Sequence, residues 1–149
     1  MNIPSILRNL FLFVSLSSGF SANAQNLTPV QIKQIEDIAR FTAAHINSNV
    51  NKQEFKQEML DQGIISVNAT AVGRNVRSEY IIPVRMPPNA IKEWLDETKA
   101  EIIPKICALN KNNNAFNRGL SYTYAYSNVY GEKLGEVFVD KATCRNLEL

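Results

Sequence analysis

The sequence predicts an α+β fold, in which two long helices cover one face of a largely antiparallel, four-stranded sheet. Three observations support this prediction. Two segments carry apolar residues at helical spacing, and four segments alternate apolar and polar residues as strands do. The order along the chain is helix, short helix, two strands, helix, two strands. Because short turns separate the members of each strand pair, we expect two hairpins and a two-layer domain.

The first 24 residues have the pattern of an export signal. Arg8 provides a positive charge, an apolar run follows, and Ala22-Asn-Ala24 supplies the small residues of a cleavage site. The apolar run is shorter than the roughly 20 residues that span a bilayer. We therefore predict a signal peptide over residues 1–24 and a single domain over 25–149 with no membrane span. The expected location is periplasmic or secreted; an uncleaved anchor is the alternative.

The net charge of the domain indicates whether it can attract a polyanionic partner. Removal of residues 1–24 takes away only Arg8 and leaves 15 basic and 14 acidic residues. A nearly neutral domain has no net field to attract polyanions, and the basic residues are scattered. Nucleic acid is therefore not an expected partner.

The first helix is predicted over residues 28–47. Thr28, Pro29 and Gln31 form a capping-box start. The residues that then recur at helical spacing are Ile32, Ile35, Ile38, Ala39, Ala43 and Ile46. Asn51-Lys-Gln-Glu54 resembles a second capped start, so a short helix should follow and end before Gly63.

The first hairpin is predicted from two alternating segments. Residues 64–72 alternate, residues 73–75 have the composition of a turn, and residues 76–85 alternate again. Pro83 lacks a backbone donor, so it belongs near a strand end or on an edge.

The second long helix should begin after Pro87-Pro88-Asn89, which stops the strand and caps the helix. Its apolar face is predicted to contain Ile91, Trp94, Leu95, Thr98, Ile102 and Ile106. Pro104 should kink or interrupt this helix, because it removes an interior hydrogen bond. Residues 110–117 are predicted to be a polar loop.

The second hairpin contains three regularly spaced tyrosines. Tyr122, Tyr124 and Tyr126 share one strand face, and small residues occupy the other. A turn over residues 128–131 leads to a strand over 134–140, in which Val137 and Phe138 point to opposite faces.

The two cysteines, Cys107 and Cys144, are predicted to form a disulfide, because thiols are oxidised in the compartments to which proteins are exported. The bond would close a loop of about 38 residues, for which loop entropy predicts about 4 kcal/mol of stabilisation. Two buried free thiols in a reducing compartment are the alternative.

No set of reactive groups predicts an enzyme, a cofactor or a metal site. His45 is the only histidine, and it lies near a helix end, where an imidazolium complements the helix dipole. A catalytic triad or a zinc site needs partners that this sequence does not supply once both cysteines are paired. The acidic residues follow helix surfaces, where solvated charge is ordinary.

Tyr122, Tyr124 and Tyr126, together with Trp94, are the candidate interaction surface. The tyrosines can pack beneath the helices as core or form an exposed aromatic strip for a partner. The small polar residues on the opposite face favour the core. Trp94 can likewise be core or the rim of a groove. We expect a non-enzymatic protein that binds another protein through the tyrosines or a sheet edge. The alternative is a module that binds a small ligand between Trp94, the tyrosines and the first helix.

The block from Ile103-Pro-Lys-Ile-Cys107 through the tyrosine strand and Tyr130–Val139 to Cys144 resembles the quorum-sensing-regulated virulence factor family. The likeness covers residues 90–145 in detail and implies a small exported α/β protein with a virulence-associated role. It carries over no catalytic residue. A second likeness is to the pilotin-type chaperones of secretin assembly, which implies an assembly factor. Those proteins are typically lipoproteins, and this chain lacks the lipid-attachment cysteine that would directly follow the apolar run.

Overall fold

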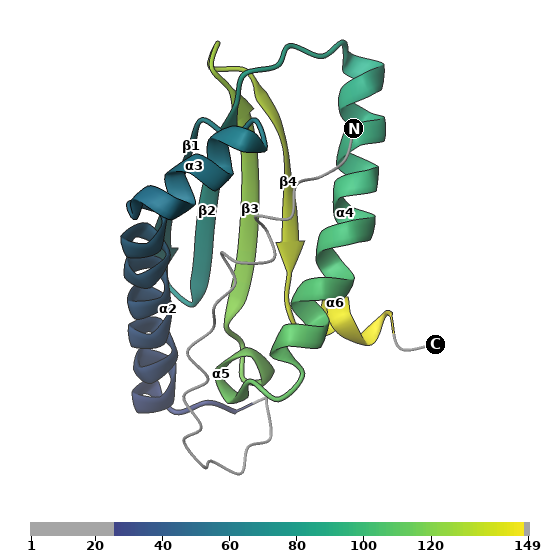
Figure 1. Cartoon of the computed structure of the whole chain (residues 1–149). Helices are drawn as coiled ribbons and strands as arrows, with labels where there is room; N and C mark the ends of the chain where they lie inside the picture. The colour runs from purple at the N-terminus through teal and green to yellow at the C-terminus, as the bar shows by residue number, and fades with distance from the viewer. Residues whose placement is uncertain (1–25, 148–149) are drawn as a thin grey trace.

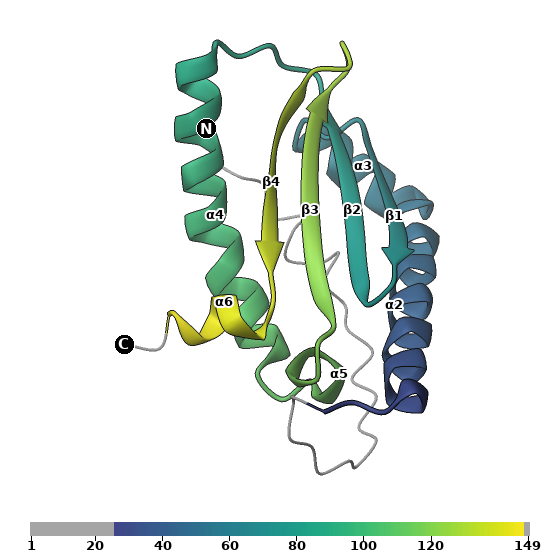
Figure 2. The same cartoon turned by 180° about the vertical axis from the view of Figure 1, so that it is seen from behind.

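The structure is a computed structural model that describes residues 26–147. The predicted signal peptide, residues 1–24, lies outside the described residues. The chain forms a sheet with helices against one face (Figure 1), and the view from behind shows the other face of the sheet (Figure 2). None of the helices within residues 26–147 is both long and apolar enough to cross a membrane.

The sheet has four strands in the order β1-β2-β3-β4, with bounds Ser66–Val72, Asn75–Ile82, Ser121–Asn128 and Lys133–Val139. The β1–β2 and β3–β4 pairs are antiparallel hairpins. The β2–β3 pair is parallel, because helix α4 (Pro88–Asn110) returns the chain to the end of the sheet at which β2 began. The predicted α+β class and largely antiparallel sheet are confirmed, with one parallel pairing at the centre.

Two long helices supply the second layer. Helix α2 (Pro29–Val50) packs on β1 and β2, and α4 packs on β4. Gly135 in β4 has φ +149°, and a Cβ atom there would lie 2.5 Å from the Leu95 side chain. Glycine therefore permits the close approach of α4 to β4. A short helix, α3 (Gln53–Asp61), follows α2 as predicted.

One of the predicted helix caps forms and two do not. The Thr28 hydroxyl accepts from the Gln31 backbone at 3.2 Å, and the Thr28 backbone donates to the Gln31 side chain at 2.8 Å. At α3 the cap is Lys52, and at α4 it is Pro87; neither makes a side-chain capping bond. Asn51 instead donates to the carbonyl of Asn47 at 2.8 Å, so α2 uses the side chain that was expected to cap α3.

Of the two predicted effects of Pro104, an interruption is wrong, because α4 runs through it for 23 residues, and a kink stays a prediction. Ile102 and Ile106, on either side of Pro104, are buried against the core, so packing outweighs the lost backbone bond.

Two short helices were not predicted. Helix α5 (Asn114–Asn117) lies in the expected polar loop, and α6 (Lys141–Arg145) follows β4. Both depend on a capping side chain: Asn113 accepts two backbone N–H groups of α5, and Asp140 accepts the Thr143 N–H of α6. Such short elements lack the apolar periodicity from which longer helices are predicted.

A side chain of α2 contacts the edge of the sheet at β1. The Asn47 amide donates to the carbonyl of Ala69 at 2.8 Å and accepts from the Ala69 N–H at 2.7 Å. This one side chain therefore satisfies both backbone groups of Ala69 on the outer side of the strand.

Candidate functional site

The predicted tyrosines lie on the helix-covered face of the sheet. Tyr122, Tyr124 and Tyr126 are 3%, 2% and 7% exposed, and Tyr80 of β2 joins them at 2%. We call these four side chains the tyrosine face. In this structure the tyrosines pack as core, which was one of the two alternatives left by the sequence. Their role as a contact for a partner stays a prediction.

The aromatic rings of the tyrosine face contact one another. The ring centroids of Tyr80 and Tyr126 are 5.2 Å apart and stacked, and those of Tyr80 and Tyr124 are 6.4 Å apart. Trp94 of α4 meets Tyr126 edge-on at 5.1 Å. Trp94 is only half-buried, so it lies at the border between this cluster and solvent.

The hydroxyl groups of the tyrosine face have different surroundings. Tyr122 donates to the side-chain oxygen of the fully buried Asn110 at 3.3 Å. The Tyr126 hydroxyl is buried and has no hydrogen-bond partner among residues 26–147. Burial raises the pKa of each tyrosine in the group, because the phenolate is poorly solvated there. The group is therefore neutral at physiological pH.

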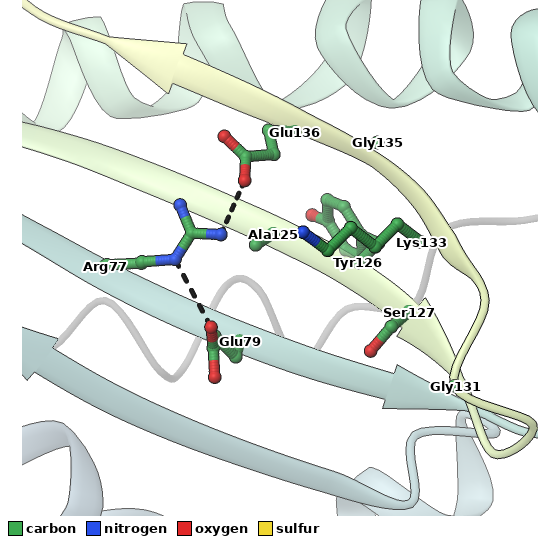
Figure 3. Close-up of a pocket in the computed structure, with 9 residues that line it drawn as sticks. All are labelled: Arg77, Glu79, Ala125, Tyr126, Ser127, Gly131, Lys133, Gly135 and Glu136. Atoms are coloured by element: carbon green, nitrogen blue, oxygen red, sulfur yellow. Dashed lines mark hydrogen bonds and ion pairs between the residues drawn. The ribbon is translucent and has the colours of Figure 1, made fainter.

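The opposite face of the sheet carries an ionic bridge across three strands (Figure 3). Arg77 of β2 donates through Nε to Glu79 at 3.3 Å and through its terminal guanidinium nitrogen to Glu136 of β4. The side chain reaches over Ala125 of β3, which is in register with both glutamates. Because Ala125 is small, it leaves room for the bridge and is itself only 9% exposed.

Hydrogen bonding between Arg77 and Glu136 raises the pKa of the guanidinium and lowers the pKa of the carboxyl. A hollow of 410 Å³ adjoins this bridge, and Ser127, Gly131 and Lys133 also line it (Figure 3). Both carboxylates are held by Arg77 in ion pairs, so the arrangement suits ordering of the surface better than acid–base chemistry.

The predicted disulfide between Cys107 and Cys144 is confirmed, with a Cα–Cα distance of 5.4 Å. It joins α4 to α6 and forms part of the wall of a second hollow, of 540 Å³. Neither of these two hollows is the pocket that the sequence suggested between Trp94, the tyrosines and the first helix.

The structure places His45 against two side chains of its own helix, α2. Its Nε2 atom is 3.0 Å from the side-chain nitrogen of Asn49, and its ring stacks on Phe41 at 6.3 Å. Within residues 26–147 no group of three or more His, Cys, Asp or Glu side chains is placed to hold a metal ion.

The ionic bridge was missed by sequence reasoning. Arg77 and Glu79 alternate on one strand, which was visible, but Glu136 is 59 residues from Arg77 and is brought to it only by the order and register of the strands. The parallel β2–β3 pairing, which places β4 near β2, has no local signal in the sequence.

Comparison with known proteins gives similarity in fold alone. No family model matches the chain, and no curated protein matches it in sequence. The resemblance to the quorum-sensing-regulated virulence factor family therefore stays a prediction.

Three solved structures are similar. A candidate secreted protein of Pseudomonas aeruginosa aligns with a TM-score of 0.62 and 11% identity, over 80% of this chain and all of that one. The type II secretion system pilotin AspS of Vibrio cholerae aligns with a TM-score of 0.50 and 16% identity, over 76% of this chain and 94% of that one. The type 2 secretion pilotin EpsS of Vibrio vulnificus aligns with a TM-score of 0.57 and 17% identity, over 78% of this chain and 97% of that one. The fold is thus shared with two secretion pilotins.

Proposed function

We propose that this protein is exported and acts, without catalysis, by binding a protein component of a bacterial secretion system, in the manner of a pilotin-like assembly factor. The observation that carries the proposal is the extent of the fold similarity: the described domain covers 94% and 97% of the two pilotin chains. A shared fold is compatible with a shared mode of action, whereas the residues that act are specific to each site. A virulence-associated role rests only on the sequence resemblance given above and is part of the same proposal.

We assign the contact to Trp94 and Tyr126, at the border of the tyrosine face. Trp94 is half-buried against Tyr126, and aromatic side chains at such borders are frequent anchors in protein interfaces. The Tyr126 hydroxyl, buried without a hydrogen-bond partner among the described residues, is a donor that an acceptor on a partner would satisfy. An unsatisfied buried donor costs about 1–3 kcal/mol, so a partner that accepts from it would gain a comparable amount.

The first test is site-specific photo-crosslinking in cells. A benzoylphenylalanine at position 94 should give an adduct with a secretion-system protein. The matched control is the same probe at Asn68, an exposed position on the opposite face of the sheet. Adducts of equal yield from both positions, or none from position 94, would refute the assigned contact.

The second test is Tyr126→Phe, which removes only the hydroxyl. If a partner accepts from this hydroxyl, the variant should bind the crosslinked protein about fivefold more weakly, while the free energy of unfolding of the unbound protein stays equal or rises by about 1 kcal/mol. Unchanged binding in a stabilised variant would show that the hydroxyl belongs to the core alone.

A further inference from the structure

Among residues 26–147, the lining of the hollow beside the disulfide contains three cations and no acidic residue. Lys111 follows the end of α4, and Lys141 and Arg145 lie on α6. Its apolar lining includes Phe116, which is buried, and Leu147, which is 47% exposed. A volume of 540 Å³ is within the range of small-molecule sites.

Half of the twelve other basic residues that the structure describes form ion pairs with carboxylates. Six basic residues among those described form ion pairs with carboxylates: Lys33, Arg40, Arg77, Arg85, Lys92 and Lys105. Within residues 26–147, Lys111, Lys141 and Arg145 form none. The Lys141 ammonium donates to the carbonyl of Asn117 at 3.4 Å, a long hydrogen bond.

The spacing of the cations on α6 adds a repulsion. Lys141 and Arg145 are four residues apart on one helix, where like charges face each other and destabilise the helix. The nearest carboxylate on this helix, Asp140, is engaged with the Thr143 backbone and hydroxyl. An external anion between the two cations would relieve the repulsion.

We propose that this hollow binds a small amphiphilic anion, in which a carboxylate, sulfonate or phosphate meets Lys111, Lys141 and Arg145 while an apolar body lies against Phe116 and Leu147. This site is separate from the contact assigned to Trp94 and Tyr126, and the proposal does not depend on the proposed function. The disulfide holds α6, and with it two of the three cations, against α4.

A pair of matched fluorescent probes tests the proposal. Anilinonaphthalene sulfonate carries an anionic group on an aromatic body, and N-phenyl-1-naphthylamine is the same body without the sulfonate. The sulfonate should bind the purified protein, and each of Lys111→Gln, Lys141→Gln and Arg145→Gln should raise its Kd about threefold, giving about 30-fold for the triple variant. Binding of the neutral probe should change less than twofold.

The control variant removes three cations elsewhere. Lys52, Lys56 and Lys99 lie outside the hollow, and changing all three to Gln produces the same loss of net charge. This control should bind the sulfonate as the parent protein does. An equal loss of affinity in both triple variants would show a general charge effect and overturn the proposal.

A competition experiment separates a soluble ligand from a membrane surface. Decanoate should displace the sulfonate from the parent protein, and decanol should not. Binding to vesicles of phosphatidylglycerol that depends on the same three residues, without displacement by decanoate, would overturn the small-molecule assignment in favour of a membrane surface.

Discussion

The two faces of the sheet are built from the same strands and achieve burial in opposite ways. On the helix-covered face, Tyr124 is 2% exposed because it packs among other aromatic rings. On the other face, its neighbour Thr123 is 7% exposed and Ala125 is 9% exposed, beneath an arginine that is paired with two glutamates. The first face gains stability from apolar area removed from water; the second is organised by charges that remain partly solvated.

The difference shows that low exposure alone does not identify the core. A buried aromatic ring contributes both area and ring contacts. A small residue covered by a solvated ion pair contributes little of either, because an exposed pair is worth at most about 1 kcal/mol.

The largest expected difference is between truncations of two adjacent residues. Tyr124→Ala should lower the free energy of unfolding by about 3–5 kcal/mol, as large-to-small changes of core aromatics do. Thr123→Ala, on the same strand and similarly buried, should lower it by about 1 kcal/mol or less. Urea unfolding measures both. Losses of equal size would mean that the two faces of the sheet contribute equally to stability, contrary to the distinction drawn between them.

Alkaline pH should act on one face only. Burial raises the pKa of the tyrosine face above the ordinary 10.0, so the unfolded chain releases phenolic protons at a lower pH than the folded chain does. The contribution of these tyrosines to the free energy of unfolding is therefore fully present below about pH 10. It falls as pH rises toward the folded-state pKa, by about 1.4 kcal/mol per pH unit for each tyrosine.

Urea unfolding at a series of pH values measures this slope. Tyr80→Phe is the control, because it keeps the ring and removes one ionisable group. The slope of stability against pH should be shallower in this variant by about 1.4 kcal/mol per pH unit, the contribution of one tyrosine. A slope that is the same in Tyr80→Phe and the parent protein would show that Tyr80 does not titrate differently in the two states.

The smallest effect is expected for the ionic bridge. Arg77→Met should cost about 1 kcal/mol at low salt, and less in high salt, because Arg77 and Glu136 are partly exposed. A double-mutant cycle with Glu136→Gln isolates the pair. A coupling well above 1 kcal/mol that persists in salt would mean that this face is held as firmly as the aromatic one.

The elements and the faces of the sheet were largely predictable, because they follow from local periodicity. Val137 and Phe138, for example, point to opposite faces as their alternation indicates, the first fully buried and the second 51% exposed. The cysteine pairing was predicted from the expected oxidising compartment and from the presence of two cysteines. These are properties that a single strand, helix or residue pair carries in its own sequence.

What could not be predicted depends on contacts between distant segments. The continuation of α4 through Pro104 depends on the packing of Ile102 and Ile106. The Arg77–Glu136 pair depends on the register of three strands. The three cations beside the disulfide are spread over residues 111–145, in a chain whose basic residues looked evenly scattered. Their grouping exists only after α6 is joined to α4.

The contact between Asn47 and Ala69 has a consequence for how the protein behaves at high concentration. A sheet edge with open backbone groups is a template on which further strands can add, and exposed Ile65 and Val72 flank this one. The amide of Asn47 already occupies both outer groups of Ala69, at the middle of β1. An incoming strand would have to displace it before it could pair, so crowding of many copies need not lead to fibrillar self-assembly through this edge.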